Sequence, residues 1–432
     1  MAEKFDCIIV GAGPAGLTAA LALARAGVEV LVLERGEYPG SKNMFGGVLY
    51  SKGLHELIPD FWDEAPVERP VARWGVSFLD QVSAMSLDFK SEQFCTAPYN
   101  AFTVLRSKFD RWYAGKVEGA GAVLLTDTTV VDFLREGGRV VGVQTNRPDG
   151  ELRADVVIAA DGINSLLCRK GGSGLDLSAD EVSLGVKEII ALPREAINKA
   201  FALNGDEGAA YTYVGSATKG IPGGGFIYTN QDSLSIGVVT KLSSLSGQDQ
   251  RPEELLEAFK RHPLIWPLVK EGELREYAAH LIPEGGGGRR APLFADGVLA
   301  VGDAAGFTLS TGLRVEGVNY SIMSGLAAAE AVKGARLLGD YTRRGLSAYP
   351  QALKKHGVLA DLEKFKRTPH FFKTSRLYQE YPALACELGH ALFGVEPGPK
   401  KGMFTIFKEQ LKGRVAWPQL LTDAFAGWRG LS

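Results

Sequence analysis

Three glycines spaced as G-x-G-x-x-G follow the apolar run FDCIIV near the start of the chain. They are Gly11, Gly13 and Gly16, and the Ala/Leu-rich stretch LTAALALARAG comes next. At a strand-to-helix junction the first glycine permits a tight turn, the second lets backbone approach a diphosphate, and the third lets helix and strand pack closely. The N-terminus of the helix then offers free N–H groups to phosphate. The segment GAGPAG, which includes Pro14 and Ala15, is therefore predicted to hold a nucleotide.

A carboxylate stands at the expected place after this loop. Glu34 ends the second apolar run, VEVLVLE, and Arg35 follows it. An acid at the end of that strand can accept hydrogen bonds from ribose hydroxyls. The alternative for Glu34 is a solvated strand end. With both strands, the helix and the acid in order, a dinucleotide site is the stronger interpretation.

Two later motifs belong to the same kind of site. Gly302-Asp303 follows the apolar run GVLAV, and the small residues after Asp303 would allow phosphates to approach. The alternative for Asp303 is a helix N-cap. Asp161-Gly162, preceded by Ala160, ends another strand, and Arg106 begins a helix.

This set of motifs resembles the glutathione-reductase-type FAD enzymes of the aromatic-hydroxylase group. The resemblance implies an FAD-binding α/β domain with an inserted antiparallel-sheet substrate domain and a helical C-terminal segment. It also implies FAD as the cofactor, because NAD-only folds lack the full set of motifs in this order.

The stretch SKNMFGGVLY of residues 41–50 narrows the resemblance. It is similar to the electron-transfer-flavoprotein:quinone oxidoreductases, and most of all to the bacterial FixC flavoprotein branch. The likeness also covers VLRSKFD, LGVKEII, GGGFIYTN and GDAAGF, and it spans roughly residues 4–395. It implies that the loop borders the isoalloxazine ring, where glycines let backbone lie against a flat ring. The residues assigned to that contact are Lys42, Asn43, Met44, Gly46 and Gly47. The alternative is a structural turn.

The segment IPGGGFIYTN of residues 221–230 is the expected quinone site. By resemblance, Gly223 and Gly224 match glycines whose backbone contacts the quinone head group in relatives. Pro222 and Gly225 depart from residues found in relatives, which leaves the individual contacts open. The alternative is a glycine-rich hairpin turn, and a β-branched residue at 224 is expected to strain a backbone that needs positive φ.

Residues 308–319 follow the GD motif, where this fold brings a helix N-terminus toward the flavin. A positive dipole there stabilises an anionic reduced flavin. Gly312 suits a close approach. Arg314 either adds positive charge or lies at the surface with its stem packed.

Composition excludes several classes of function. The chain has 432 residues, formal net charge −2, 45% hydrophobic and 23% charged residues. This balance favours neither nucleic acid nor an anionic surface, and no apolar run reaches the roughly 18 residues of a spanning helix. The four cysteines form no CxxC pair, which disfavours a metal or iron–sulfur site held by this chain alone. We expect a reduced, cytoplasmic protein without a bound metal.

The pattern of strands predicts a discontinuous organisation. Residues 1–75, 103–172 and 285–345 are expected to form the FAD-binding domain, residues 76–102 and 173–284 the quinone domain, and residues 346–432 a helical C-terminal region. Residues 181–240 are read as antiparallel strands joined by short turns. Residues 76–102 and 369–394 are candidates for peripheral membrane contact, although 369–394 reads better as core or as a partner interface.

The resemblance implies an FAD-dependent electron-transfer subunit. It would take electrons from an electron-transferring flavoprotein, through a separate ferredoxin-like iron–sulfur subunit, and pass them to quinone at the inner face of the cytoplasmic membrane. The separate subunit is expected because this sequence carries no appended four-cysteine domain. The alternatives are a geranylgeranyl (isoprenoid) reductase, an NAD(P)H-dependent flavin monooxygenase, and an electron relay without a substrate site.

Overall fold

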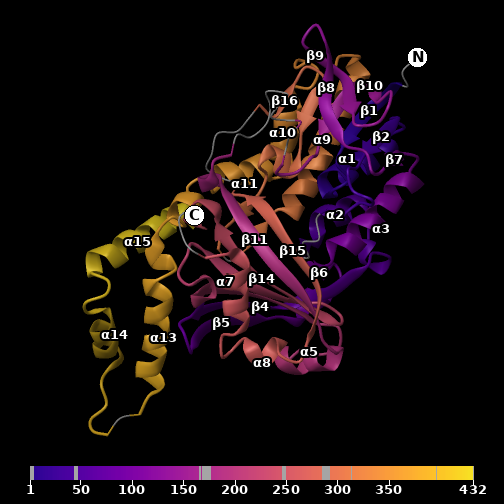
Figure 1. Cartoon of the computed structure of the whole chain (residues 1–432). Helices are drawn as coiled ribbons and strands as arrows, with labels where there is room; N and C mark the ends of the chain where they lie inside the picture. Colours follow the sequence, from indigo (N-terminus) through magenta and orange to yellow (C-terminus); the bar gives the residue numbers. More distant parts are fainter. Residues whose placement is uncertain are drawn as a thin grey trace. The chain divides into compact units, whose positions relative to one another are not determined.

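The computed structural model describes residues 4–42, 47–164, 167, 177–245, 250–284, 292–312, 314–395 and 397–431 (Figure 1). Two compact units account for the chain. The first comprises residues 1–67, 104–178 and 282–366, and the second comprises residues 68–103, 179–281 and 367–432. Both units are discontinuous in sequence.

A largely parallel sheet forms the centre of the first unit. Its order is β16-β17-β10-β1-β2-β7, with β1 parallel to both β10 and β2, and with the hairpin β8–β9 attached to β10. The apolar runs form the central strands β1, β2 and β17, whose side chains are almost all buried, as in a sheet covered on both faces. The bounds are β1 (Lys4–Val10), β2 (Val30–Leu33), β7 (Val123–Leu125), β8 (Val130–Glu136), β9 (Arg139–Thr145), β10 (Glu151–Ala159), β16 (Phe294–Ala295) and β17 (Val298–Ala300).

Two helices of the first unit pack closely through small residues. They are α1 (Pro14–Ala24) and α9 (Val318–Leu338). A side chain at Gly325 of α9 would collide with the carbonyl oxygen of Ala15 and come within 2.9 Å of the Thr18 Cβ. The other helices here are α2 (Ser51–Leu57), α3 (Arg106–Gly119), α10 (Tyr349–Lys355) and α11 (Val358–Lys364), and short strands β3 (Gly47–Tyr50), β18 (Leu309–Ser310) and β19 (Val315–Glu316) complete the unit.

A mostly antiparallel sheet forms the second unit, in the order β15-β11-β14-β13-β12-β4-β6 with β5 paired to β4. The expected strands are present, but two connections differ from the prediction. Helix α5 (Arg194–Phe201) separates β11 from β12, and β12 runs parallel to β4. The bounds are β4 (Val67–Leu79), β5 (Ala84–Lys90), β6 (Ala101–Val104), β11 (Val182–Ala191), β12 (Gly208–Gly215), β13 (Gly223–Thr229), β14 (Ser233–Lys241) and β15 (Glu273–Pro283).

One face of this sheet carries the apolar core of the second unit. Helix α7 (Pro252–Lys260) buries Leu255, Leu256 and Phe259 in the same cluster as Ile227 and Ile236. Helices α6 (Leu242–Leu245) and α8 (Trp266–Val269) flank it in sequence. The amphipathic spacing of α7 places its apolar side against the sheet.

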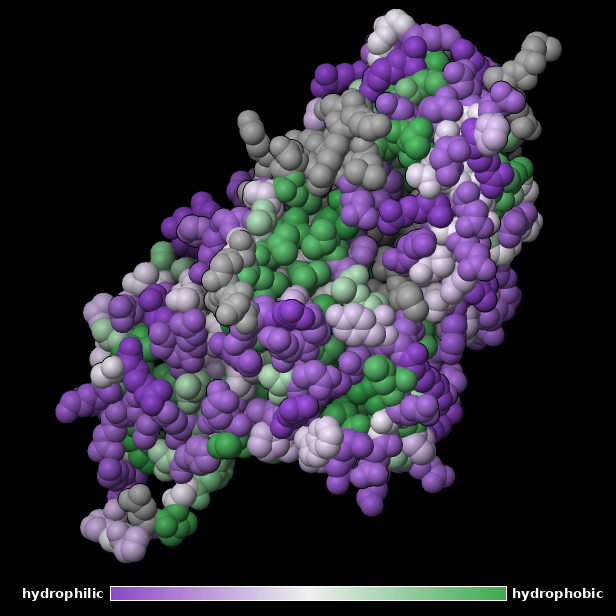
Figure 2. Space-filling model, in the orientation of Figure 1, coloured by the Kyte–Doolittle hydropathy of each residue, from purple (hydrophilic) through white to green (hydrophobic). Residues whose placement is uncertain are grey.

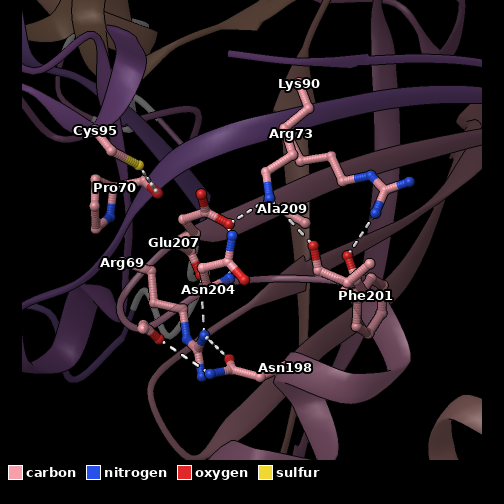
Figure 3. Close-up of polar contacts among 12 residues, drawn as sticks. Arg69, Pro70, Arg73, Lys90, Cys95, Asn198, Phe201, Asn204, Glu207 and Ala209 are labelled. Atoms are coloured by element: carbon pink, nitrogen blue, oxygen red, sulfur yellow. Dashed lines mark hydrogen bonds and ion pairs between the residues drawn. The ribbon is translucent and has the colours of Figure 1, made fainter. Parts of the chain in front are cut away.

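A fully buried arginine joins several loops of the second unit (Figure 3). The Arg69 guanidinium donates to the Asn198 side chain at 2.5 Å and to the backbone oxygens of Asn230, Glu207 and Gln231 at 2.6, 2.9 and 3.1 Å. Burial lowers the pKa of Arg69 to about 10. These acceptors engage all three nitrogens of the guanidinium and four of its five N–H groups, as a buried charge requires.

The C-terminal helices belong to the second unit: α12 (Thr368–Phe371), α13 (Glu380–Phe393), α14 (Met403–Leu411) and α15 (Trp417–Leu431). Asp423 of α15 accepts two hydrogen bonds from Arg376, at 2.7 and 2.8 Å, and one from the Tyr381 hydroxyl at 2.6 Å. This buried carboxylate ties α15 to the chain before it. None of the helices in the described part combines the length and the apolar character needed to cross a bilayer.

Candidate functional site

The glycine loop has the geometry of a phosphate cradle. A side chain at Gly11, where φ is +105°, would overlap the Ala160 carbonyl oxygen, and one at Gly16 would overlap the carbonyl oxygen of Gly11. These two glycines are therefore required by the close packing of β1, β10 and α1. By contrast, the nearest atom to an added Cβ at Gly13 is the Arg106 Nη2, 3.9 Å away. The loop thus leaves open space at its middle glycine, in front of the N-terminus of α1, which suits a bound diphosphate.

Pro14 and Ala15 open helix α1 and are buried. Proline is well tolerated at the first helical position, because the N–H that it lacks would have no acceptor within the helix. Ala15 also packs against the GD motif, since an added Cβ at Gly302 would lie 3.0 Å from the Ala15 Cβ. The first glycine motif and the GD motif therefore lie side by side.

The Glu34 carboxylate is held in place by backbone. Its Oε2 accepts the N–H of Ala12 at 2.9 Å, and its Oε1 accepts the N–H of Gly36 at 2.7 Å. Each oxygen has a further lone pair, which is the capacity that a ribose hydroxyl uses. Arg35, the next residue, is exposed.

Arg106 begins α3 and lies beside the glycine loop. Its Nε and Nη2 donate to the two carboxylate oxygens of Asp110, at 2.7 and 2.6 Å, and both residues are buried. Burial lowers the pKa of Arg106, but the Asp110 carboxylate more than offsets this, so the pKa is raised and the guanidinium stays charged. Asp110 therefore orients a permanent positive charge next to the open space at Gly13.

Asp303 follows Gly302, whose N–H is held by the Ser324 hydroxyl at 2.9 Å. Burial raises the pKa of Asp303 to about 6, although Arg106 opposes the shift. None of the described residues donates a hydrogen bond to the Asp303 carboxylate. A half-buried carboxylate in this condition is suited to accept hydroxyl groups of a cofactor, because those donors would relieve its loss of hydration.

Asp161 differs from Asp303 in having a partner from the protein. Its Oδ2 accepts the backbone N–H of Leu167 at 3.1 Å, and Gly162 next to it has φ of +69°. Both features belong to a turn that leaves β10. A side chain at Gly162 would meet no atom of the described residues within 4 Å.

The structure describes only part of the loop at 41–50. Lys42 is exposed, and Gly47 begins β3 in a position where an added Cβ meets nothing within 4 Å. Asn43, Met44 and Gly46 lie outside the described residues. Among the described residues, none blocks a flat ring from lying against the backbone of Gly47.

Residues 308–319 form a β18–β19 hairpin that leads into α9. Gly312 has φ of +79° and lies in the turn of this hairpin. Arg314 is 60% exposed, and its Nε lies 3.8 Å from the carboxylate of Glu316, an acid that is mostly buried. Gly317 precedes the first turn of α9, a helix of 21 residues. The N-terminus of α9 is thus available as a positive dipole.

Gly223 and Gly224 lie in strand β13, so the interpretation of this segment as a hairpin turn is wrong. Gly224 pairs with Val239 of β14, and an added Cβ there would lie 2.7 Å from the carbonyl oxygen of Tyr213. The positive φ expected at Gly224 is found at Gly223 instead, with φ of +148°. The pairing of β12 with β13 begins at Gly225, so Gly223 and Gly224 lie beyond the end of that ladder.

Sequence reasoning missed Asp110 and Ser324, the two residues that orient Arg106 and the GD motif. Asp110 could have been predicted from the sequence, because it follows Arg106 by four positions and so lies on the same face of the helix, where the two side chains can pair. Ser324 could not have been predicted, because its contact with Gly302 depends on how α9 packs against the GD motif. Gly13 lies beside Arg106, Glu34 accepts the N–H of Ala12 in the same loop, and Asp303 follows the Gly302 that packs on Ala15. This grouping within the first unit fits a dinucleotide with two ribose-like chains and a diphosphate.

Comparison with known proteins identifies that dinucleotide. Residues 6–173 and 99–331 match models described as FAD dependent oxidoreductase, and residues 368–431 match the ETF-QO/FixC family C-terminal domain. The first two matches cover the glycine loop, Arg106 and the GD motif. FAD is therefore the cofactor, and the enzyme is an oxidoreductase.

Solved structures support the fold. A geranylgeranyl bacteriochlorophyll reductase-like protein from Thermoplasma acidophilum has a TM-score of 0.72 at 20% identity and covers 98% of this chain and 99% of its own. The myxobacterial halogenase CndH has a TM-score of 0.66 at 18% identity, with 99% and 97% coverage. At these identities the likeness shows a shared FAD-enzyme architecture and nothing about the substrate.

Curated relatives are similar along nearly the whole chain. The probable electron transfer flavoprotein-quinone oxidoreductase YdiS of Escherichia coli (strain K12) is 41% identical over 427 residues, covering 96% of this chain and 99% of its own. Protein FixC of Salmonella typhi is 41% identical, with 95% and 98% coverage, and Protein FixC of Bradyrhizobium diazoefficiens is 40% identical, with 99% of each chain covered. The chain therefore belongs to the electron transfer flavoprotein-quinone oxidoreductase/FixC family of FAD-dependent electron-transfer oxidoreductases.

Proposed function

We propose that this chain accepts electrons from an electron-transferring flavoprotein, through a separate ferredoxin-like iron–sulfur subunit, and passes them to quinone in the membrane. The observation that carries the proposal is the end-to-end similarity to a relative named as an electron transfer flavoprotein-quinone oxidoreductase. The three described cysteines, Cys7, Cys95 and Cys386, lie on separate elements, which is consistent with an iron–sulfur cluster held by another chain.

The residues of the first unit are suited to hold FAD without taking part in proton transfer. The glycine loop and the N-terminus of α1 would hold the diphosphate, with Arg106 supplying positive charge. Glu34 and Asp303 would accept hydrogen bonds from cofactor hydroxyls. When bound, FAD supplies one- and two-electron transfer, and the protein sets its position and potential.

We further propose that the strands of residues 76–102 and 173–284 carry the quinone site, with Gly223 and Gly224 contacting the head group through backbone. The position of these glycines beyond the β12–β13 ladder supports this, because their backbone groups on that side are not used by β12 pairing. The proposal also places the loop of residues 42–47, including Lys42, Asn43, Met44, Gly46 and Gly47, beside the flavin ring. Arg35, Ala160, Asp161, Gly162, Gly312 and Arg314 complete the proposed cofactor surroundings.

Peripheral attachment to the inner face of the cytoplasmic membrane follows from the proposed substrate, since quinone is dissolved in the bilayer. One of the alternatives, an electron relay without a substrate site, differs from this proposal only in whether the chain itself reduces quinone. A relay would pass electrons between proteins and would leave free quinone unreduced.

Co-purification tests the proposed partners. The tagged full-length chain, expressed in its native host, should bring down a flavoprotein and an iron–sulfur protein and should reduce quinone when that flavoprotein is supplied in reduced form. Reduction of a prenyl lipid double bond would instead identify an isoprenoid reductase. Rapid consumption of NADPH and oxygen by the isolated chain would identify a monooxygenase.

A further inference from the structure

The segment LGVKEII of strand β11 contains a fully buried lysine, Lys187. Hydrophilic residues cover most of the surface seen in Figure 2. Lysines usually lie at such a surface, because a buried ammonium group loses its hydration. Lysines that are kept in the interior often serve in proton transfer.

Lys187 lies on the face of the second sheet that is opposite to helix α7. Glu188, the next residue, accepts a hydrogen bond from Lys260 of α7 at 2.7 Å. Successive side chains of a strand alternate between the two faces of the sheet. Lys187 therefore turns away from α7 and from the apolar core that α7 covers.

A glycine of the proposed quinone site belongs to the same face as Lys187. An added Cβ at Gly225 would lie 2.8 Å from an aromatic ring of α7, so Gly224 and Phe226 turn to the other face. Gly237 of β14 pairs with Lys187 on one side and with Phe226 on the other, and residues directly opposite each other share a face. Neighbouring strands lie about 4.8 Å apart, so β11 and β13 are separated by about 10 Å. A lysine side chain and a quinone head group together span that distance.

A tyrosine on this face offers a hydrogen bond but no proton. Tyr228 follows Phe226 by two positions, and the two rings are stacked with their centroids 4.9 Å apart. Burial raises the pKa of Tyr228 to about 12, so its hydroxyl keeps its proton at neutral pH. An ammonium group ordinarily gives up a proton more readily than a phenol with that pKa. Lys187 is therefore the better proton donor of the two.

A carboxyl group on the neighbouring strand lies near Lys187. Strand β15 ends the sheet next to β11 (Figure 1), and Glu276 lies half-buried within it. Burial raises the pKa of Glu276, and the charge of Lys187 opposes this shift, so the two groups interact. Among the described residues, none makes a hydrogen bond with the buried oxygen Oε1 of Glu276. The same strand exposes Leu274 and Tyr277, so its edge is open to water.

Reduction of a quinone requires protons as well as electrons. Two electrons and two protons convert a quinone to a quinol. FAD in its reduced, anionic form carries both electrons but only one transferable proton. The second proton must come from water or from a group of the protein, and a positioned side chain transfers it faster.

We propose that Lys187 donates this second proton to a carbonyl oxygen of the quinone and that Glu276 returns a proton to Lys187. An N–H bond of the ammonium breaks as the O–H bond of the quinol forms, while the quinone is reduced and the flavin is oxidised. The neutral amine then takes the proton of the Glu276 carboxyl, and water reprotonates the carboxylate. The inference rests on the proposed function, because it assigns residues to the same reaction.

Two electron acceptors separate proton transfer from electron transfer. The FAD-loaded protein, reduced chemically without oxygen, is mixed with a soluble quinone or with ferricenium, which takes one electron and no proton. Lys187→Met should reduce quinone about a hundredfold more slowly than the wild type, since a positioned proton donor is lost. It should reduce ferricenium at the wild-type rate. Glu276→Gln should show a smaller loss with quinone alone, and its half-buried position tests the inference if Lys187→Met does not fold.

The matched control is Lys260→Met on the opposite face of the sheet. Lys260 is bound to Glu188 and Glu257 at 2.7 and 2.5 Å, so its loss should leave the ratio of the two rates unchanged. A second measurement needs no turnover. Infrared titration of the oxidised protein should show a higher pKa for the Glu276 carboxyl in Lys187→Met than in the wild type, because the opposing charge is gone.

Several results would overturn the inference. Equal loss with both acceptors in Lys187→Met would show a structural role, and a wild-type quinone rate in that variant or in Glu276→Gln would show that the proton comes from elsewhere. An unchanged pKa of the Glu276 carboxyl in Lys187→Met would show that the two groups are not coupled. A wild type that reduces ferricenium but no quinone would contradict the proposed function itself, and this inference with it.

Discussion

Replacing Asp303 by alanine should weaken FAD binding much more than replacing Asp161. The two acids both follow strands of the first unit, but only Asp161 has a hydrogen bond from the described protein, the N–H of Leu167 at 3.1 Å. The Asp303 carboxylate has none among the described residues. We therefore expect the Asp303 carboxylate to accept hydrogen bonds from the cofactor, and Asp161 mainly to shape a turn.

The size of the effect follows from the kind of bond that is lost. A hydrogen bond to a charged group contributes about 1.5–3 kcal/mol. Since about 1.4 kcal/mol corresponds to a tenfold change in affinity, Asp303→Ala should raise the dissociation constant of FAD by roughly ten- to a hundredfold. Asp161→Ala should change that constant by less than about fivefold, since its main contact is with the protein.

The stability of the protein without FAD should respond in the opposite order. Because burial raises the pKa of Asp303 to about 6, the ionised carboxylate destabilises the apoprotein above that pH, and this penalty disappears as the pH falls below the unfolded value near 3.9. At pH 7 the Asp303→Ala apoprotein should therefore unfold at the same temperature as the wild type or higher. Asp161→Ala should unfold at a lower temperature, because it loses the Leu167 hydrogen bond.

Fluorescence titration of the apoproteins with FAD measures the affinities, and thermal unfolding with and without FAD measures the stabilities. Equal loss of FAD affinity in the two variants would refute the assignment. A large drop in the unfolding temperature of the Asp303→Ala apoprotein would show that Asp303 has a structural role instead.

The remaining predictions concern packing and charge. Gly224→Ala should lower the free energy of unfolding by about 1–3 kcal/mol, because its Cβ would lie 2.7 Å from the Tyr213 carbonyl oxygen. The control is Gly334→Ala in α9, where no described atom lies within 4 Å of the added Cβ, and it should raise that free energy by about 0.5–1 kcal/mol. Urea unfolding measures both changes. Asp423→Asn should cost about 1–3 kcal/mol at neutral pH. The hydrogen bonds from Arg376 lower the Asp423 pKa, so this stabilisation is present above the unfolded pKa and is lost as the pH falls through the folded one. Variant and wild type should therefore converge in thermal unfolding at acid pH, and a pH-independent difference would argue against the ion pair. Arg106→Lys cannot make both bonds to Asp110 and should release FAD faster in dialysis than the wild type, whereas unchanged retention would show that the guanidinium fork is not needed.

The nucleotide-binding part of the fold could be predicted from the sequence because its signals are local. The spacing of the glycines indicates one turn of backbone, formed by Gly11, Gly13 and Gly16. The apolar runs on either side indicate strands that are buried on both faces. Glu34 follows from the length of the same βαβ unit. Each of these features depends on residues close together in the chain.

The glycines of β13 show why the rest could not be predicted. Three consecutive glycines indicate a turn. Here, however, glycine is needed because residues on other elements leave no room for a side chain. An added Cβ at Gly224 would meet Tyr213, and one at Gly225 would lie 2.8 Å from Phe259. The parallel pairing of β12 with β4 is likewise a contact between segments more than a hundred residues apart. The orientation of the GD motif by Ser324 depends on the same kind of tertiary packing.

Reoxidation of the reduced flavin tests the account most directly. The purified protein, reduced chemically without oxygen, is mixed in a stopped-flow instrument with a soluble quinone or with oxygenated buffer, and the flavin absorbance is followed. Quinone should reoxidise the flavin much faster than oxygen does, and NADPH should not reduce it. Rapid reduction by NADPH followed by rapid reaction with oxygen, with quinone inert, would contradict it.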